Sequence, residues 1–227
     1  MKIEEATNPE LVTPPFDDQH KRGNELHPDL PYPPMSLMLV GPKGSGKSNL
    51  ILRLLYGNRK KKDAKNEYHK FYRHFFDKVY IFSPSWKLDK KMSRCQIPED
   101  QIFEDAEYYP QIIEELLAGQ ADDIEEDGKE NAEHILMVFT DLAGQKGVFS
   151  SAKGIMNKLA FNLRHYKVSL IIDTQSLRQI NQAFRGNLSG AVLFSGISNR
   201  LEIQKIYDEY LGEFSKDEQQ QLLEHCF

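Results

Sequence analysis

Short apolar runs recur along this chain, and stretches with helical spacing of apolar residues separate most of them. The runs are Met35–Val40, Val79–Phe82, Ile135–Phe139, Val168–Ile172 and Ala191–Phe194. Runs of this length, rich in β-branched and aromatic residues, predict strands. Because they do not alternate with polar residues, both faces of the strands should be buried. The pattern predicts an α/β three-layer sandwich with a mainly parallel five-stranded core sheet, whose ligand site lies at the carboxyl ends of the strands.

Helical spacing is clearest in three segments between these runs. Asn49 to Tyr56 is followed by Gly57-Asn58, which is a typical helix stop, and the other two segments are Tyr109–Leu117 and Ser151–Arg164. Between the last two, Ala121 to Glu130 is crowded with acidic residues around Gly128. We expect a solvated loop there and not a metal site, because the spacing of an EF-hand is missing.

Proline dominates the start of the chain. Residues 1–34 contain repeated prolines and few aliphatic side chains, which predicts an extended arm that lies on the domain or on a neighbouring subunit, with disorder as the alternative. Residues 35–227 are predicted to form one domain, large enough to bury a full hydrophobic core.

The formal net charge of −5 argues against a protein coated in positive charge. Any contact with nucleic acid should therefore come from a local patch or from an assembled ring. The candidate patch is the stretch 59–73, where lysines and arginines alternate with tyrosine and phenylalanine. A solvated amphipathic helix is the other interpretation of this stretch.

The sequence gives no support for a disulfide framework, a zinc site or a membrane span. Cys95 and Cys226 are far apart and belong to no Cys/His cluster, so neither a disulfide framework nor a zinc site is indicated, and a reducing cytosol suits them. We expect no membrane span, because no apolar run approaches the roughly 20 residues that crossing a bilayer needs. The polar, acidic N-terminus is unlike a signal peptide.

The most specific motif follows the first apolar run directly. A glycine, four free positions and Gly-Lys-Ser match the phosphate-binding loop, in which backbone N–H groups and a helix N-terminus point at one anion. Lys47 is expected to place its ammonium on the β- and γ-phosphates of ATP, and the Ser48 hydroxyl to bind Mg²⁺. The predicted nucleotide-binding residues are Gly41, Pro42, Lys43, Gly44, Ser45, Gly46, Lys47, Ser48 and Asn49.

Polar residues follow two other predicted strands. The run Ile135–Phe139 leads into Thr140-Asp141, which has the form of a Walker B element and makes Asp141 a candidate ligand of Mg²⁺ and a candidate catalytic carboxylate. Val168–Ile172 leads into Asp173, Thr174 and Gln175, and a glutamine amide can donate to a γ-phosphate and accept from water. Since side chains alternate along a strand, Asp173 and Gln175 should point the same way, and Asp173 could lie close to Asp141.

The order of these motifs resembles the genome-packaging ATPases of large DNA viruses, the poxvirus type, within the FtsK/HerA division of P-loop motors. The resemblance spans about Leu37 to Leu211 and includes Val-Tyr-Ile-Phe-Ser-Pro-Ser-Trp at 79–86, Leu-Arg-His at 163–165 and Phe-Arg-Gly-Asn at 184–187. It implies a homo-oligomeric ring, driven by ATP, that moves double-stranded DNA into a preformed capsid. The capsid packaging vertex would be its partner and its place in the virion, and the host cytoplasm its place during assembly.

By position, the resemblance also implies roles for three further side chains. Gln175 would be the sensor at the end of the strand between the phosphate-loop strand and the Walker B strand. Arg164 resembles the arginine that enters the site of the next subunit, with Arg185 as the second choice. A surface ion pair is the alternative for either arginine.

One position departs from the family pattern, in which two consecutive acids usually end the Walker B strand. With Thr140-Asp141, either Asp141 is the catalytic base and Thr140 only supports a water bound to Mg²⁺, or Asp141 holds the metal and the base comes from elsewhere, with Asp173 as the spare carboxylate. A weak ATPase is the third possibility. The rival functions are accordingly a nucleotide-dependent switch or scaffold at a capsid vertex and a small-molecule phosphotransferase.

Overall fold

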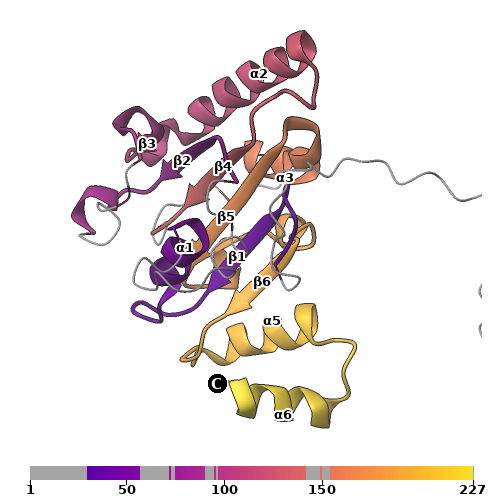
Figure 1. Ribbon diagram of the computed structural model, residues 1–227. Coiled ribbons are helices and arrows are strands. Elements are labelled where there is room, and N and C mark those ends of the chain that lie inside the picture. Colours follow the sequence, from indigo (N-terminus) through magenta and orange to yellow (C-terminus); the bar gives the residue numbers. More distant parts are fainter. Residues whose placement is uncertain are drawn as a thin grey trace, which may run out of the picture.

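A single parallel sheet organises the molecule (Figure 1). The structure is a computed structural model, and it describes residues 30–56, 72, 75–89, 95, 97–141, 149 and 154–226. Its six strands pair in the order β3-β2-β4-β5-β1-β6, and every pairing is parallel. The strands are β1 (Ser36–Val40), β2 (Lys78–Phe82), β3 (Ile102–Phe103), β4 (Ile135–Phe139), β5 (Val168–Thr174) and β6 (Gly190–Leu193).

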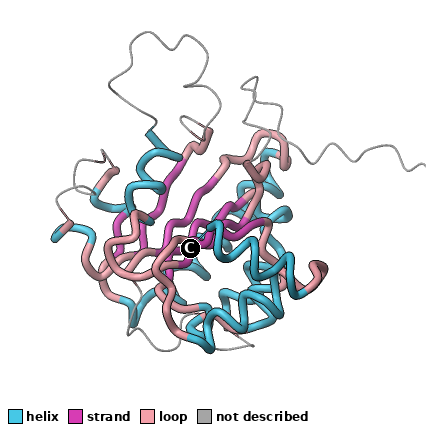
Figure 2. The backbone as a smooth tube through the Cα atoms, turned by 90° about the horizontal axis from the view of Figure 1, so that it is seen from below, coloured by secondary structure: helices cyan, strands magenta, loops and turns pink. Residues whose placement is uncertain are grey.

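Helices surround the strands, as the view at right angles to the first shows (Figure 2). The α-helices are α1 (Lys47–Tyr56), α2 (Tyr109–Asp127), α3 (Ile155–Tyr166), α4 (Gln182–Arg185), α5 (Arg200–Tyr210) and α6 (Lys216–Cys226). Short 3-10 turns are η2 (Trp86–Leu88), η4 (Glu99–Gln101), η5 (Ala106–Tyr108) and η6 (Leu177–Gln179).

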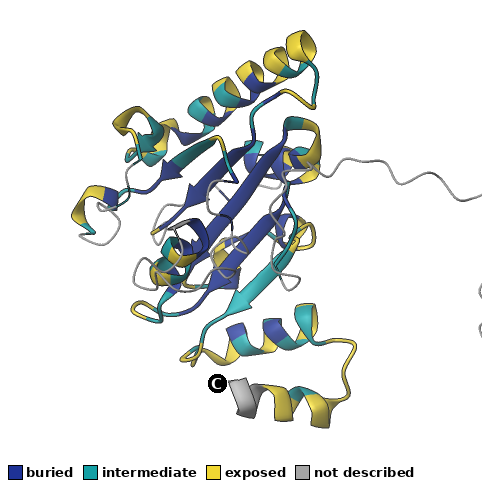
Figure 3. Ribbon diagram, viewed as in Figure 1, coloured by how far each residue is buried: buried dark blue, intermediate teal, exposed yellow. Residues whose placement is uncertain are grey.

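Two hydrophobic clusters cover opposite faces of the sheet. Side chains that alternate along the strands pack on one face with α2, α3 and α4, and on the other face with α1 and the aromatic residues Tyr72 and Phe75. The inner strands β1, β4 and β5 are buried along their whole length, whereas residues 216–222 of the outer helix α6 are mostly exposed (Figure 3). The predicted three-layer α/β architecture is therefore confirmed.

Two details of the prediction are wrong. The sheet has six strands and not five, because the two-residue β3 pairs with the outer edge of β2, and two residues are too short for a hydrophobic pattern to be recognised. The acidic segment is also not a loop up to Gly128, because α2 continues to Asp127. Its acids occupy the exposed side of the helix, while Ile113, Leu117 and Gln120 form the buried side.

Most of the proline-rich arm, residues 1–29, lies outside the described residues. The part that follows lies on the domain, since the Tyr72 hydroxyl donates to the Pro31 carbonyl at 2.5 Å and the Tyr32 ring meets the Phe75 ring edge-on. Among the helices of the described residues, none combines the length and the apolar character needed to cross a membrane.

Candidate nucleotide-binding site

The phosphate loop connects the inner strand β1 to α1 at the carboxyl edge of the sheet (Figure 1). The N–H of Gly41 donates to the Thr174 carbonyl at 3.2 Å, which ties the start of the loop to the end of β5. Inside the loop the Ser45 N–H donates to the Pro42 carbonyl at 3.3 Å. Helix α1 begins at Lys47, so its free N–H groups face the loop, as anion binding at a helix N-terminus requires.

Glycine is required in this loop for two different reasons. A Cβ on Gly41 would lie 2.6 Å from the Phe194 Cβ and 2.8 Å from the Ser45 Oγ, closer than such atoms can approach. Gly44 and Gly46 have φ angles of 81° and 108°, which L side chains rarely adopt. The loop is therefore shaped by its backbone, and such a backbone cradle fits a phosphate chain.

The Lys47 side chain folds back over this loop. Its ammonium donates to the carbonyls of Gly41 at 2.7 Å and Pro42 at 3.1 Å, and the residue is only 7% exposed. Burial lowers the pKa of Lys47, while the negative charges of Asp173 and Asp141 act in the opposite direction. The ammonium is thus held beside the loop and close to both acids.

Asp141 and Asp173 meet at the ends of neighbouring strands. The N–H of Asp141 donates to the Asp173 Oδ1 at 3.3 Å, so the proximity predicted from strand parity is found. Asp141 has a positive φ of 54° and an exposed side chain, and its Oδ2 accepts from the Ser85 hydroxyl at 2.6 Å. Asp173 is 8% exposed. Burial raises the pKa of Asp173, although the Lys47 charge and the Asp141 N–H oppose this effect.

A cavity of about 310 Å³ lies between the phosphate loop and these strand ends. It brings together Lys47, Ser48, Asp141, Asp173 and Gln175, all of which the sequence suggested. Of the predicted nucleotide-binding residues, Gly41, Pro42 and Ser45 do not line the cavity. The lining consists of Lys43, Gly44, Gly46, Lys47, Ser48, Asn49, Ser83, Ser85, Trp86, Asp89, Thr140, Asp141, Asp173 and Gln175.

Five lining residues were not among the predicted site residues. One is Thr140, which precedes Asp141 after β4, and the other four follow β2. These four are Ser83, Ser85, Trp86 and Asp89. The Ser85 N–H donates to the Ser83 Oγ at 3.4 Å, and Trp86 is 3% exposed. One signal could have found them, because the carboxyl ends of adjacent parallel strands meet at the same edge and β2 pairs with the Walker B strand β4.

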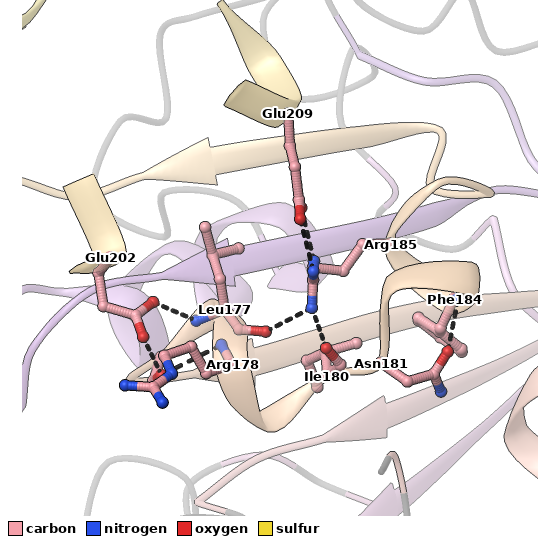
Figure 4. Close-up of polar contacts among 9 residues, drawn as sticks. Leu177, Arg178, Ile180, Asn181, Phe184, Arg185, Glu202 and Glu209 are labelled. Atoms are coloured by element: carbon pink, nitrogen blue, oxygen red, sulfur yellow. Dashed lines mark hydrogen bonds and ion pairs between the residues drawn. The ribbon is translucent and has the colours of Figure 1, made fainter. Parts of the chain in front are cut away.

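Neither candidate arginine lines the cavity. Arg164 is exposed in the last turn of α3, and β5 begins four residues later at Val168, so Arg164 lies toward the amino edge of the sheet. Arg185 is 6% exposed, and its guanidinium binds Glu209 and the carbonyls of Leu177 and Ile180 (Figure 4). In this arrangement Arg185 serves the internal packing of its own subunit. Apart from Tyr72, the basic stretch 59–73 lies outside the described residues.

Comparison with known proteins supports the fold. No protein-family model matches this chain, and no curated protein sequence matches it. Among solved structures, the DNA-packaging ATPase B204 from Sulfolobus Turreted Icosahedral Virus is similar, with a TM-score of 0.53 and 15% identity, over 80% of this chain and 84% of that chain.

Two structures of the genome packaging NTPase B204 from Sulfolobus turreted icosahedral virus 2 are similar in the same way. The complex with ATP-gammaS has a TM-score of 0.51 and 14% identity, over 79% of this chain and 83% of that chain. The complex with AMPPCP has a TM-score of 0.52 and 16% identity, over 79% and 83%. At these identities the likeness shows the fold alone. The predicted P-loop NTPase fold is confirmed.

Proposed function

We propose that this chain is an ATPase that drives double-stranded viral DNA into a preformed capsid, as a homo-oligomeric ring at the packaging vertex. The observation that carries the proposal is the convergence of the phosphate loop, Asp141, Asp173 and Gln175 on one cavity. The resemblance to poxvirus-type packaging ATPases of the FtsK/HerA division and the fold shared with a viral DNA-packaging ATPase support the finer assignment.

The chemistry of the lining fits ATP and Mg²⁺. Backbone N–H groups of a glycine loop, the Lys47 ammonium and a helix N-terminus all favour a triphosphate. The Ser48 hydroxyl and the Asp141 carboxylate are oxygen donors, which Mg²⁺ prefers. Ser48 and Asp141 would hold the ion, which would supply positive charge beside the phosphates.

In hydrolysis, a bond forms between water and the γ-phosphorus, and the bond to the β–γ bridging oxygen breaks. The proton of the attacking water needs an acceptor. We assign this role to Asp173, because burial raises its pKa and makes its carboxylate a better base. Asp141 would then hold the metal, Gln175 would position the water, and Lys47 would stabilise negative charge that builds on the phosphates.

An arginine from a neighbouring subunit would complete the site. Arg164 is our candidate, because it is exposed and lies away from the cavity of its own subunit. A cation supplied in this way makes turnover depend on assembly. DNA would be held through its phosphates, so binding should be indifferent to sequence and sensitive to salt.

The test is ATP turnover with and without double-stranded DNA, together with the mass of the assembly. We expect the protein to be an oligomer whose ATP turnover is stimulated by double-stranded DNA. Lys47→Ala should abolish this turnover without preventing folding. Lys158→Ala, which removes an exposed lysine on α3, is the matched control and should behave as wild type. Nucleotide binding without turnover would favour the rival function, a switch or scaffold at the capsid vertex.

A further inference from the structure

The segment that begins at Gln175 is held in place by the distant helix α5. Directly after Gln175, the Ser176 hydroxyl donates to the Glu202 Oε1 at 2.5 Å. The Leu177 N–H donates to the Glu202 Oε2 at 2.8 Å (Figure 4). Glu202 lies in the first turn of α5 and is 5% exposed. Both oxygens of a buried carboxylate therefore bind the two residues that follow the predicted sensor.

The same segment is held a second time at the other end of α5. The Arg185 Nε and Nη2 donate to the Glu209 carboxylate at 2.6 and 2.5 Å. The Arg185 Nη1 donates to the Leu177 carbonyl at 2.9 Å and also to the Ile180 carbonyl. The fork of one guanidinium thus joins α5 to both ends of η6, and a planar fork of this kind fixes orientation as well as distance.

Both carboxylates project from one side of α5. Glu202 and Glu209 are seven residues apart, which is about two helical turns, so they lie on the same face. Ile206 lies between them and is buried in the core cluster. The helix therefore presents a face of two acids and one apolar residue to the segment 175–185.

Ordinary capping of η6 does not account for Glu202. The Ser176 Oγ already accepts from the Arg178 N–H at 3.2 Å, as a cap does. A buried carboxylate is costly unless it is fully hydrogen-bonded, and a serine alone would satisfy a three-residue turn. Glu202 adds a connection between α5 and Ser176, and Ser176 directly follows Gln175, which lines the cavity.

We propose that Glu202 is a positioning residue for Gln175, and that α5 moves with the state of the nucleotide pocket through the contacts of Glu202 and of Arg185 with Glu209. This inference rests on the proposed function, because it assigns Gln175 to the water or the γ-phosphate. Movement of the segment at its cavity end would pull on Glu202, and the helix hairpin α5–α6 would carry that movement to the surface.

The first experiment compares ATP turnover in Glu202→Ala, Glu202→Gln and Gln175→Ala. We expect Glu202→Ala to lower kcat at least about tenfold, since misplacing a reacting group by about 1 Å can cost a hundredfold, while KM changes less than about twofold. Glu202→Gln keeps one acceptor and should recover part of the loss. The control is Glu213→Ala, which changes an exposed acid just after α5.

A double variant separates positioning from general damage to the fold. If Glu202 acts through Gln175, the variant that carries both Gln175→Ala and Glu202→Ala should be no slower than Gln175→Ala alone. Losses that multiply in the double variant would overturn the inference, and so would wild-type kcat in Glu202→Ala.

Amide hydrogen exchange in the full-length protein provides a readout that does not depend on turnover. Adding a non-hydrolysable ATP analogue with Mg²⁺ should slow exchange in residues 200–210 of the wild type, and this response should be lost in Glu202→Ala that still binds the analogue. An unchanged response in that variant overturns the inference. If the wild-type protein binds the analogue but hydrolyses no ATP, the proposed activity is refuted. The hydrogen-exchange comparison then tests the contact between Glu202 and the pocket by itself. A wild type that binds no analogue refutes both.

Discussion

Replacing Gly41 by alanine tests whether the backbone shapes the phosphate loop. The new Cβ would lie 2.6 Å from the Phe194 Cβ, which is bonded directly to the main chain. A rotamer change cannot relieve this contact, and the Phe194 N–H is itself held by the Val40 carbonyl at 2.7 Å. Overpacking of this kind costs about 1–3 kcal/mol. In a protein of this size each kcal/mol lowers Tm by about 2–4 °C, so we expect a loss of roughly 2–12 °C.

Gly119→Ala is the matched control for this change. Gly119 lies inside α2, where an added Cβ meets nothing within 4 Å. Alanine is a better helix former than glycine by about 0.5–1 kcal/mol, so this variant should be slightly more stable than wild type.

Thermal unfolding and titration with an ATP analogue measure both consequences of Gly41→Ala. Affinity should fall together with Tm, because the carbonyl of Gly41 holds the Lys47 ammonium at 2.7 Å and moves with the loop. A Gly41→Ala protein whose Tm lies within about 1 °C of wild type, with unchanged affinity for the analogue, would refute the reasoning.

Four further predictions concern the assembly, the acids, the buried ion pair and the metal. Arg164→Ala subunits should bind ATP without turning it over and should recover activity when mixed with Lys47→Ala subunits; rings shown to be mixed but inactive would contradict action across the subunit boundary. Asp173→Asn should lower turnover at least about a hundredfold, with partial rescue by Thr140→Asp. Asp173→Asn should also raise Tm at pH 7–8, because a raised pKa means that ionised Asp173 destabilises the fold. This gain in Tm should disappear as the pH falls through the raised pKa. A gain that persists at low pH would argue against a raised pKa of Asp173. Glu209→Ala should cost about 3 kcal/mol by leaving buried Arg185 unpaired. Glu104→Ala, in the exposed pair with Lys87, should cost clearly less in the same unfolding experiment. Chelating Mg²⁺ should weaken ATP binding about tenfold or more, equivalent to about 1.4 kcal/mol, and equal affinity with and without the metal in a titration would argue against Asp141 as its ligand.

Local sequence predicted the elements that carry the nucleotide cavity. Each central strand is a run of apolar residues buried on both faces, and a parallel sheet needs such runs. The phosphate loop was predictable because its residues are consecutive in the sequence and its conformation is local, with Gly44 and Gly46 at φ angles of 81° and 108° that favour glycine. The approach of Asp173 to Asp141 followed from strand parity and from the neighbouring positions of β4 and β5.

Contacts between distant segments could not be predicted in this way. Ser85 donates to Asp141 across 56 residues, and Arg185 finds Glu209 across 24. Both contacts depend on where loops place a side chain in the folded protein, and the periodicity of the sequence does not predict that placement. From the sequence, Arg185 could be predicted to act on a neighbouring subunit. Only the position of α5 shows that its guanidinium is bound by Glu209 of the same subunit.

The charges around the cavity explain why it would favour a nucleotide that carries a metal ion. Its lining contains the ammonium groups of Lys43 and Lys47 but three carboxylates, those of Asp89, Asp141 and Asp173. A triphosphate adds further negative charge, and at short range in a partly buried site such repulsion is screened poorly. Mg²⁺ would turn part of this repulsion into attraction, because acids become its ligands. The burial that raises the pKa of Asp173 opposes folding, so keeping a carboxylate there makes sense where chemistry requires it.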